Sequence, residues 1–443
     1  MPDARWLFGC YVHIVLIQHI VTIDNTSARR SATGKETFGG KTLTKITRRS
    51  ALGAATIIAL ARPGLIRAQS SPIRIGLLSD VAGPYRNVGG PGAKIAVDLA
   101  VEDFGGHLLG RPIEVVQADI QNKPDISSAK AREWIDAGFN VLVDGGATSS
   151  GLAVQEVARA KKTIYLGNGP SATDLTGRFC SPYGFHFWAD TYSLAKGTGT
   201  ALTKAGGTSW FFITADYQFG YSLQANTERF VKAAGGQILG DAKVPLGTTD
   251  FSSALLAARA SGAKVVGFAN AGADLQNCIK QASEFGIVKG GQSLATLLMF
   301  VTDVVALGQD VCEGLVLTNS FYWDMTPKTR AWTERFAKRM GQPPTMVQAA
   351  DYSAAMHWMR AAQAAKSVDA DSVAAKMREM PVNDFYHDNV PVRANGQVMD
   401  PMHVWRVKPA AKAAHKWDFY EPIGMIEGKD AFMPLNETGC ALG

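Results

Sequence analysis

From residue 72 onward, short apolar runs rich in β-branched residues alternate with segments of helical periodicity. Glycines such as Gly105 and Gly106 follow the helical segments and end them. Because parallel strands need a crossover connection, this alternation predicts a parallel sheet with helices on both faces. The predicted strands of this first run are residues 73–78, 113–117, 141–143 and 163–166.

The same alternation restarts near residue 210, which predicts a second sheet. Its strands are predicted at 210–214, 265–268, 294–299 and 315–318, and helices are predicted at 327–340, 346–366 and 370–379. Two strand-like runs, 403–407 and 417–420, follow. Two runs of alternation indicate two α/β domains, and ligands of such sheets bind outside the carboxyl ends of the strands.

The basic surplus of the chain lies before residue 69. Residues 1–68 hold ten Lys or Arg and three Asp or Glu, a net charge of +7. The remaining residues hold 35 basic and 36 acidic side chains, a net charge of −1. The body of the protein therefore gives no electrostatic reason to expect a nucleic-acid partner.

Residues 1–68 have the parts of a secretory leader. Arg48-Arg49 precede an apolar run over 51–61, and Ala68 offers a small residue for cleavage. Paired arginines at this place are typical of a twin-arginine signal, so we expect an exported, periplasmic protein. A second apolar segment, 6–23, lies upstream, and we hypothesise that residues 1–40 come from an over-extended start.

Four cysteines follow the leader: Cys180, Cys278, Cys312 and Cys440. In an oxidising compartment they allow three full pairings, and none has the close spacing of a metal site. Cys278 falls on an apolar helix face, which favours a buried thiol. We expect a disulfide between Cys180 and Cys440, which would tie the tail to the body.

Three loops follow predicted strands of the first run and offer polar groups. The first is Ser79-Asp80-Val81-Ala82-Gly83-Pro84-Tyr85, and the others span 144–150 and 167–174. The hydroxyls of the latter two, with free N–H groups at a helix start, suit a carboxylate, although Ser and Thr also serve as plain helix caps. Aromatic residues cluster in two further loops, 216–220 and 321–324, where some should line a cleft.

The segments that resemble catalytic or cofactor-binding motifs do not match those motifs in full. Residues 167–172 match the dinucleotide pattern G-x-G-x-x-A, but they follow the fourth strand and hold Pro170 inside the turn. Residues 89–95 lack the Gly-Lys-Ser/Thr of a phosphate loop, and no nucleophile elbow occurs. Histidines show no metal spacing, and the titratable groups expected in the cleft are only Asp80, Asp144, Asp216 and Asp303, too few for a catalytic centre. The sequence therefore gives no nucleophile–base pair, and we expect no catalytic activity, cofactor or metal.

From residue 73 to about 420 the chain resembles the leucine/isoleucine/valine-binding family of periplasmic solute-binding proteins, which serve ABC importers. The resemblance rests on the order and spacing of motifs along nearly the whole body rather than on one motif. These motifs lie at 79–85, 102–106, 110–115, 144–150, 170–173, 216–220 and 249–252.

The resemblance implies the fold of a type I periplasmic binding protein. This fold is α/β, with two Rossmann-like lobes on central, mostly parallel sheets, joined by a three-segment hinge. The first lobe would combine 72–188 with 318–402, and the second would combine 189–317 with 403–443. The lobes would close over a ligand, and the closed form, a monomer, would dock on a membrane permease.

The resemblance also implies a ligand site. Thr148 and Ser149, with Ala172 and Thr173, are similar to the family's clamp on a ligand carboxylate. Other positions of the cleft fall in the same loops: Tyr85, Val88, Ser171, Tyr217, Phe219, Ala271, Gly272 and Tyr322. Ala271 and Gly272 are smaller than the aromatic residue usual there, and Gly272 would make room for a ring.

The expected class of ligand depends on the role of Asp303. Amino-acid binders of this family use an acidic residue of the second lobe to pair the ligand ammonium, and Asp303 lies in the corresponding region. We expect a branched-chain or other apolar amino acid as ligand if Asp303 serves this role. If Asp303 points elsewhere, an aromatic or other organic acid is favoured, and an amide or urea-like solute or a role as a ligand sensor are the remaining alternatives.

Overall fold

The computed structural model describes residues 71–144 and 146–442. The predicted leader, its arginine pair, its cleavage at Ala68 and the hypothesis on residues 1–40 lie outside the described residues. In the described part of the chain, no helix is both long and apolar enough to cross a membrane.

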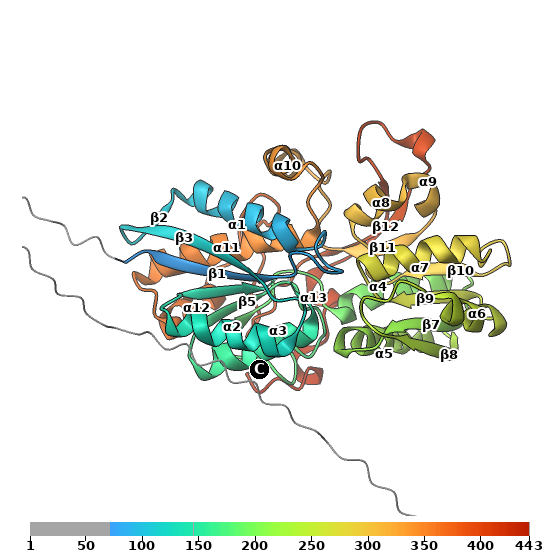
Figure 1. Cartoon of the computed structure of the whole chain (residues 1–443), viewed down its shortest axis with the longest axis horizontal. Helices are drawn as coiled ribbons and strands as arrows, with labels where there is room; N and C mark the ends of the chain where they lie inside the picture. The colour runs from blue at the N-terminus through green and yellow to red at the C-terminus, as the bar shows by residue number, and fades with distance from the viewer. Residues whose placement is uncertain (1–70, 145, 443) are drawn as a thin grey trace, which may run out of the picture. The chain divides into compact units, whose positions relative to one another are not determined.

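The first lobe is built on a six-stranded sheet in the order β2-β3-β1-β4-β5-β6 (Figure 1). Its strands are β1 (Ile73–Ser79), β2 (His107–Leu108), β3 (Arg111–Asp119), β4 (Val141–Asp144), β5 (Ile164–Gly167) and β6 (Gly184–Phe185). All neighbours are parallel except β2 and β3. One face carries α1 (Gly90–Phe104) and α11 (Met346–Ala365), and the other carries α2 (Pro124–Asp136) and α3 (Thr148–Ala160).

Successive side chains of β1 face opposite sides of this sheet, as the two-residue period of a strand requires. Ile75 and Leu77 belong to the core under α1, whereas Leu78 packs with Trp134 of α2 in a second core. Gly76 lies under the Trp134 ring, where a Cβ atom would stand 2.5 Å from the nearest ring carbon. The close approach of α2 to the sheet therefore requires glycine at this position.

The second lobe is built on a four-stranded, fully parallel sheet in the order β10-β9-β7-β8. Helices α4 and α5 pack on each other, and α6 packs against β7 and β8. The strands are β7 (Ser209–Ala215), β8 (Gln237–Val244), β9 (Val265–Ala269) and β10 (Ser293–Thr296). The helices are α4 (Thr191–Lys204), α5 (Gln218–Ala233), α6 (Ser252–Ala260), α7 (Ala273–Glu284), α8 (Val301–Leu307) and α9 (Gln309–Cys312).

A third, antiparallel sheet joins β11 (Val316–Asn319), β12 (Met402–Val407) and β13 (Tyr420–Ile426). Strands β11 and β12 pack against α4, whereas α10 (Pro327–Met340) packs on α1, as α11 does. The chain therefore passes between the lobes in three segments, as expected for the hinge. The remaining elements are α12 (Ala370–Glu379), α13 (Gly428–Ala431) and the short 3-10 turns Ala410–Lys412 and Leu435–Glu437.

The alternation of strand and helix is confirmed for both lobes, but several strands differ from the prediction. The two-residue strands β2 and β6 were not predicted, and the run 315–318, predicted for the second sheet, forms β11 of the third. The strand predicted at 417–420 is wrong, since the backbone of Trp417 has φ 66° and β13 begins only at Tyr420. The Trp417 carbonyl accepts hydrogen bonds from the Tyr322 hydroxyl at 2.7 Å and the Trp323 indole at 3.1 Å, which hold this turn. Strand β8 was not predicted, because its residues alternate between exposed and half-buried and so lack a buried apolar run.

Cys180 and Cys440 form a disulfide across a sequence separation of 260 residues. Cys278 and Cys312 are buried free thiols. Near the disulfide, the Arg393 guanidinium donates a hydrogen bond to the Met433 carbonyl at 2.8 Å. The tail is thus fastened to the first lobe by a covalent bond and a hydrogen bond.

Replacing Cys180 and Cys440 together by serine should lower the free energy of unfolding by about 2–4 kcal/mol, because the disulfide restricts the unfolded chain. Urea unfolding under non-reducing conditions measures this loss. Wild-type protein treated with a reductant should unfold like the double variant. Equal stability of the oxidised wild-type protein and the double variant would contradict the structural role of this bond.

Candidate ligand-binding cavity

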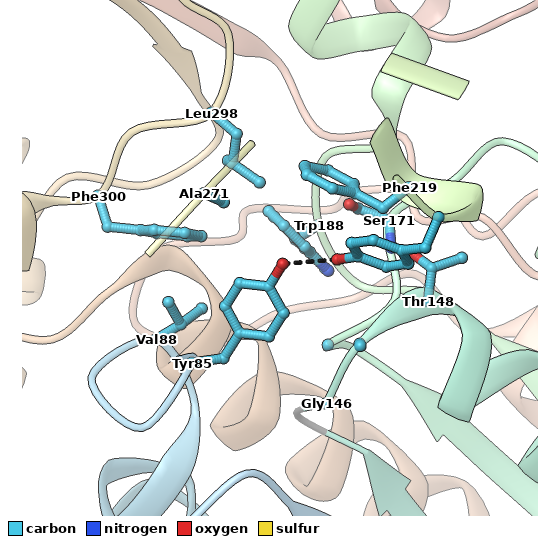
Figure 2. A pocket seen from close by; sticks show the side chains of 13 residues that line it. Tyr85, Val88, Gly146, Thr148, Ser171, Trp188, Phe219, Ala271, Leu298 and Phe300 are labelled. Atoms are coloured by element: carbon cyan, nitrogen blue, oxygen red, sulfur yellow. Dashed lines mark hydrogen bonds between the residues drawn. The ribbon is translucent and has the colours of Figure 1, made fainter. Parts of the chain in front are cut away.

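A cavity lies where loops of the first lobe meet loops of the second (Figure 2). Its volume of about 20 Å³ holds one or two water molecules, so an organic solute requires the lobes or the lining side chains to move. The lining residues are Tyr85, Val88, Gly146, Ala147, Thr148, Gly169, Ser171, Trp188, Tyr217, Phe219, Ala271, Leu298 and Phe300.

The polar part of the lining surrounds the start of α3. Thr148 is the first residue of this helix, and the N-cap residue, Ala147, makes no side-chain capping hydrogen bond within the described part of the chain. The Thr148 hydroxyl accepts hydrogen bonds from the backbone N–H of Ser171 at 3.2 Å and of Ala172 at 3.4 Å. The N–H groups of the first helical turn and the helix dipole make this corner of the cavity favourable for an anion.

The rest of the lining is apolar or aromatic. Val88 of the first lobe faces Leu298 and Phe300 of the second across the cavity (Figure 2), and all three are buried. The Phe300 ring lies 6.3 Å from that of Trp188, centroid to centroid. Such walls suit the hydrocarbon part of a solute, because apolar surface gains free energy on leaving water.

Two tyrosines connect the lobes beside the cavity. The hydroxyl of Tyr85 lies 2.6 Å from the hydroxyl of Tyr217, and Figure 2 marks this hydrogen bond with a dashed line. Burial raises the pKa of both phenols, so both stay protonated at neutral pH. A second contact between the lobes runs from the Ala273 N–H to the Pro84 carbonyl at 3.2 Å.

Seven of the thirteen predicted ligand residues line this cavity. They are Tyr85, Val88, Thr148, Ser171, Tyr217, Phe219 and Ala271, and their contact with a solute stays a prediction. The other six predicted residues do not line it. They are Ser149, Ala172, Thr173, Gly272, Asp303 and Tyr322.

Ser149 and Thr173, expected in the carboxylate clamp, are not part of the lining. Ser149 follows Thr148 in α3 and so projects about 100° around the helix from it. The Thr173 hydroxyl pairs with that of Ser222 at 3.2 Å, which is a contact between the lobes. The Ala172 backbone N–H donates a hydrogen bond to the Thr148 hydroxyl, and Ala172 itself is not part of the lining.

Asp303 does not line this cavity, and its pairing with a ligand ammonium stays a prediction. Its carboxylate accepts hydrogen bonds from the Gln276 side-chain amide and from the Phe300 backbone N–H, each at 2.8 Å. The second bond satisfies a free donor at the start of α8. Burial raises the pKa of Asp303 to about 7.

Gly272 and Tyr322, also expected in the ligand site, make structural contacts outside the cavity lining. Gly272 has φ 61°, and a Cβ there would lie 2.7 Å from the Pro84 carbonyl, so its small size permits this approach of the lobes. That it also makes room for a ring stays a prediction. The Tyr322 hydroxyl donates to Trp417 and accepts from the Phe419 N–H at 3.0 Å, inside an aromatic cluster away from the cavity.

Six lining residues were absent from the predicted set: Gly146, Ala147, Gly169, Trp188, Leu298 and Phe300. Three of them lie in loops that the sequence had singled out, because they adjoin Thr148 or Ser171. Leu298 and Phe300 lie in the segment from which Asp303 alone was predicted as a ligand residue. Trp188 follows β6, a two-residue strand without a periodic signal, so no pattern drew attention to it.

The pKa of Asp303 predicts a pH dependence that asparagine at this position should remove. Since the folded-state pKa lies above the usual value near 3.9, protonated Asp303 favours the folded protein, and this contribution is lost as pH rises through 7. Between pH 4 and pH 8, Asp303→Asn should gain roughly 2–4 kcal/mol of unfolding free energy relative to wild type.

Urea unfolding at several pH values measures this difference. Asp125→Asn, at an exposed position of α2, serves as the control and should follow the wild-type profile. Parallel profiles for wild type and Asp303→Asn would contradict the buried, structural role of this carboxyl group.

Comparison with known proteins shows similarity to one protein family and to several solved structures. The model of a family described as periplasmic binding protein matches residues 72–414. A crystal structure of a periplasmic binding protein from Burkholderia mallei is 45% identical, covers 84% of this chain and 99% of its own, and has a TM-score of 0.82.

Two further solved structures are named for their ligand class. A branched chain amino acid ABC transporter periplasmic ligand-binding protein from Burkholderia xenovorans is 34% identical, with a TM-score of 0.74 and coverage of 84% of this chain and 99% of its own. An ABC transporter solute binding protein from R. palustris, in complex with benzoate, is 19% identical, with a TM-score of 0.74 and coverage of 84% and 100%. At that identity the likeness concerns the fold alone.

Proposed function

Because the chain belongs to the periplasmic binding protein family, whose members bind solutes for transport and are not enzymes, we propose that it captures a small organic acid in this cavity and delivers it to the permease of an ABC importer. The solute is an aromatic or other apolar monocarboxylate without an ammonium group. The observation that carries this choice is the composition of the lining: among its residues that the structure describes, none is Asp or Glu.

The start of α3 supports binding of the carboxylate. The first-turn N–H groups there have no side-chain cap, and the Thr148 hydroxyl can turn to donate to an anion. The Ser171 and Ala172 N–H groups, which now donate to Thr148, are further donors at the same corner. Charge-assisted hydrogen bonds of this kind are stronger than neutral ones.

The aromatic wall supports an apolar tail on the solute. An ammonium group next to Val88, Leu298 and Phe300 would be buried without a counter-charge, which is strongly unfavourable. Asp303 is already occupied by Gln276 and Phe300, so it does not offer that counter-charge.

An apolar amino acid is the second candidate, and Asp274 favours it. One oxygen of this buried carboxylate accepts from the Gly247 N–H at 3.0 Å, and the other has no hydrogen-bond partner among the described residues. Asp274 is close enough to Tyr85 and Tyr217 for its charge to raise the pKa of both phenols, although burial is the larger cause.

Capture requires the lobes to open and close about the hinge, and solute contacts to both lobes shift this equilibrium. We propose that the moving bodies are 72–188 with 318–402 and 189–317 with 403–443, acting as a monomer. The leader that ends at Ala68 would export the chain to the periplasm. The matching family and the similar solved structure are both described as periplasmic binding proteins.

Pairs of solutes that differ only in the ammonium group test the proposal. 3-Phenylpropanoate should bind at least tenfold more tightly than phenylalanine, and 4-methylpentanoate more tightly than leucine, because the lining leaves an ammonium unpaired. Isothermal titration calorimetry measures each dissociation constant. 3-Phenylpropanamide, which lacks the negative charge, should bind at least tenfold more weakly than the acid.

Tighter binding of the amino acids would contradict the choice of solute. In that case loss of the preference in Asp274→Asn would establish the second candidate. Binding of none of these compounds would remove the proposed site from consideration.

A further inference from the structure

Trp188 has a polar group that the fold leaves unused. Its side chain is 1% exposed, and its indole nitrogen has no hydrogen-bond partner among the described residues. Buried donors in folded proteins nearly always find an acceptor, and an unpaired one is unfavourable by the cost of removing it from water. The indole N–H is a donor only and does not titrate, so it requires an acceptor atom at every pH.

An unpaired indole alone does not indicate a site. Trp332 and Trp358 are also buried, and their indole nitrogens likewise lack a partner among residues 71–144 and 146–442, but neither lines the cavity. Trp188 differs because it lines the cavity from the first lobe, where a solute can supply the missing acceptor.

The backbone and ring of Trp188 are held in place by neighbours. Its carbonyl accepts from the Gln397 side-chain amide at 3.0 Å, and its ring lies 5.8 Å from that of His186 and 6.3 Å from that of Phe300. In the view of Figure 2 the blue indole nitrogen lies at the end of the ring toward Thr148, and the far end of the ring lies toward Phe300. The donor is therefore on the same side as the anion-favouring corner at α3.

We infer that the Trp188 indole N–H donates a hydrogen bond to a carboxylate oxygen of the bound solute. The start of α3 would bind this carboxylate from one side and Trp188 from the other, while the indole ring contacts the hydrocarbon part. This assignment rests on the proposed function, since it requires a carboxylate solute. It makes Trp188 a residue that fixes the orientation of the solute, with its charged end at α3.

Trp188→Phe tests the assignment, since phenylalanine keeps an aromatic ring and removes the donor. Calorimetric titration with 3-phenylpropanoate should give a dissociation constant at least tenfold higher than that of wild type. Trp358→Phe is the matched control, because it removes an unpaired, buried indole N–H of α11 that does not line the cavity, and its affinity should equal that of wild type.

A second measurement separates the hydrogen bond from loss of ring contact. In ¹H–¹⁵N spectra of the wild-type protein, the indole signal that is absent from Trp188→Phe should move downfield on addition of 3-phenylpropanoate. Weaker binding by the variant without that downfield movement would overturn the assignment, because the ring then acts by packing alone.

The two proposals fail in different ways. Wild-type binding together with equal affinity of Trp188→Phe would overturn the role of Trp188 and leave the proposed function intact. Absence of binding by the wild-type protein to any acid of the panel would overturn both.

Discussion

The carboxyl ends of parallel strands determine where this protein can place a site. In the first lobe, the lining residues follow β1, β4, β5 and β6, which are neighbours in one sheet and end at one edge. In the second lobe they follow β7, β9 and β10, again neighbours in one parallel sheet. Every lining residue therefore follows the carboxyl end of a strand, in a loop or in the first turn of the next helix, and the cavity forms where the two edges meet.

The chemistry of the cavity follows from an uneven distribution of polar groups along these loops. The donors gather at the start of α3 and at Trp188, whereas Val88, Leu298 and Phe300 supply hydrocarbon and aromatic surface. In such a water-poor setting a charge-assisted hydrogen bond is strong, and a charge without a partner is correspondingly unfavourable. One negative charge at one end of the solute matches this arrangement, and an added positive charge does not.

Much of the fold follows from sequence periodicity, because a buried parallel strand has a continuous apolar run and a covering helix has an apolar face. The loops after β1, β4, β5 and β7 were predicted for the same reason, and with them Tyr85, Thr148, Ser171 and Tyr217. The sequence does not determine which side of a loop a side chain faces. Asp303 looked like a ligand residue because of its position, yet its carboxylate satisfies the start of α8.

Trp188 was not predicted as a ligand residue, because it follows a strand of only two residues, which has no detectable periodicity. Strand β8 and the turn at Trp417 were misread because an edge strand and a turn held by tertiary hydrogen bonds lack local signals. These residues depend on contacts between distant parts of the chain, which a single sequence does not display.

A crystal structure of the protein with bound 3-phenylpropanoate tests the central claim most directly. The account predicts both carboxylate oxygens within hydrogen-bond distance of the Thr148 corner of α3, and the phenyl ring between Val88, Leu298 and Phe300. The reverse orientation, with the carboxylate among these apolar residues and the ring at the start of α3, would contradict it.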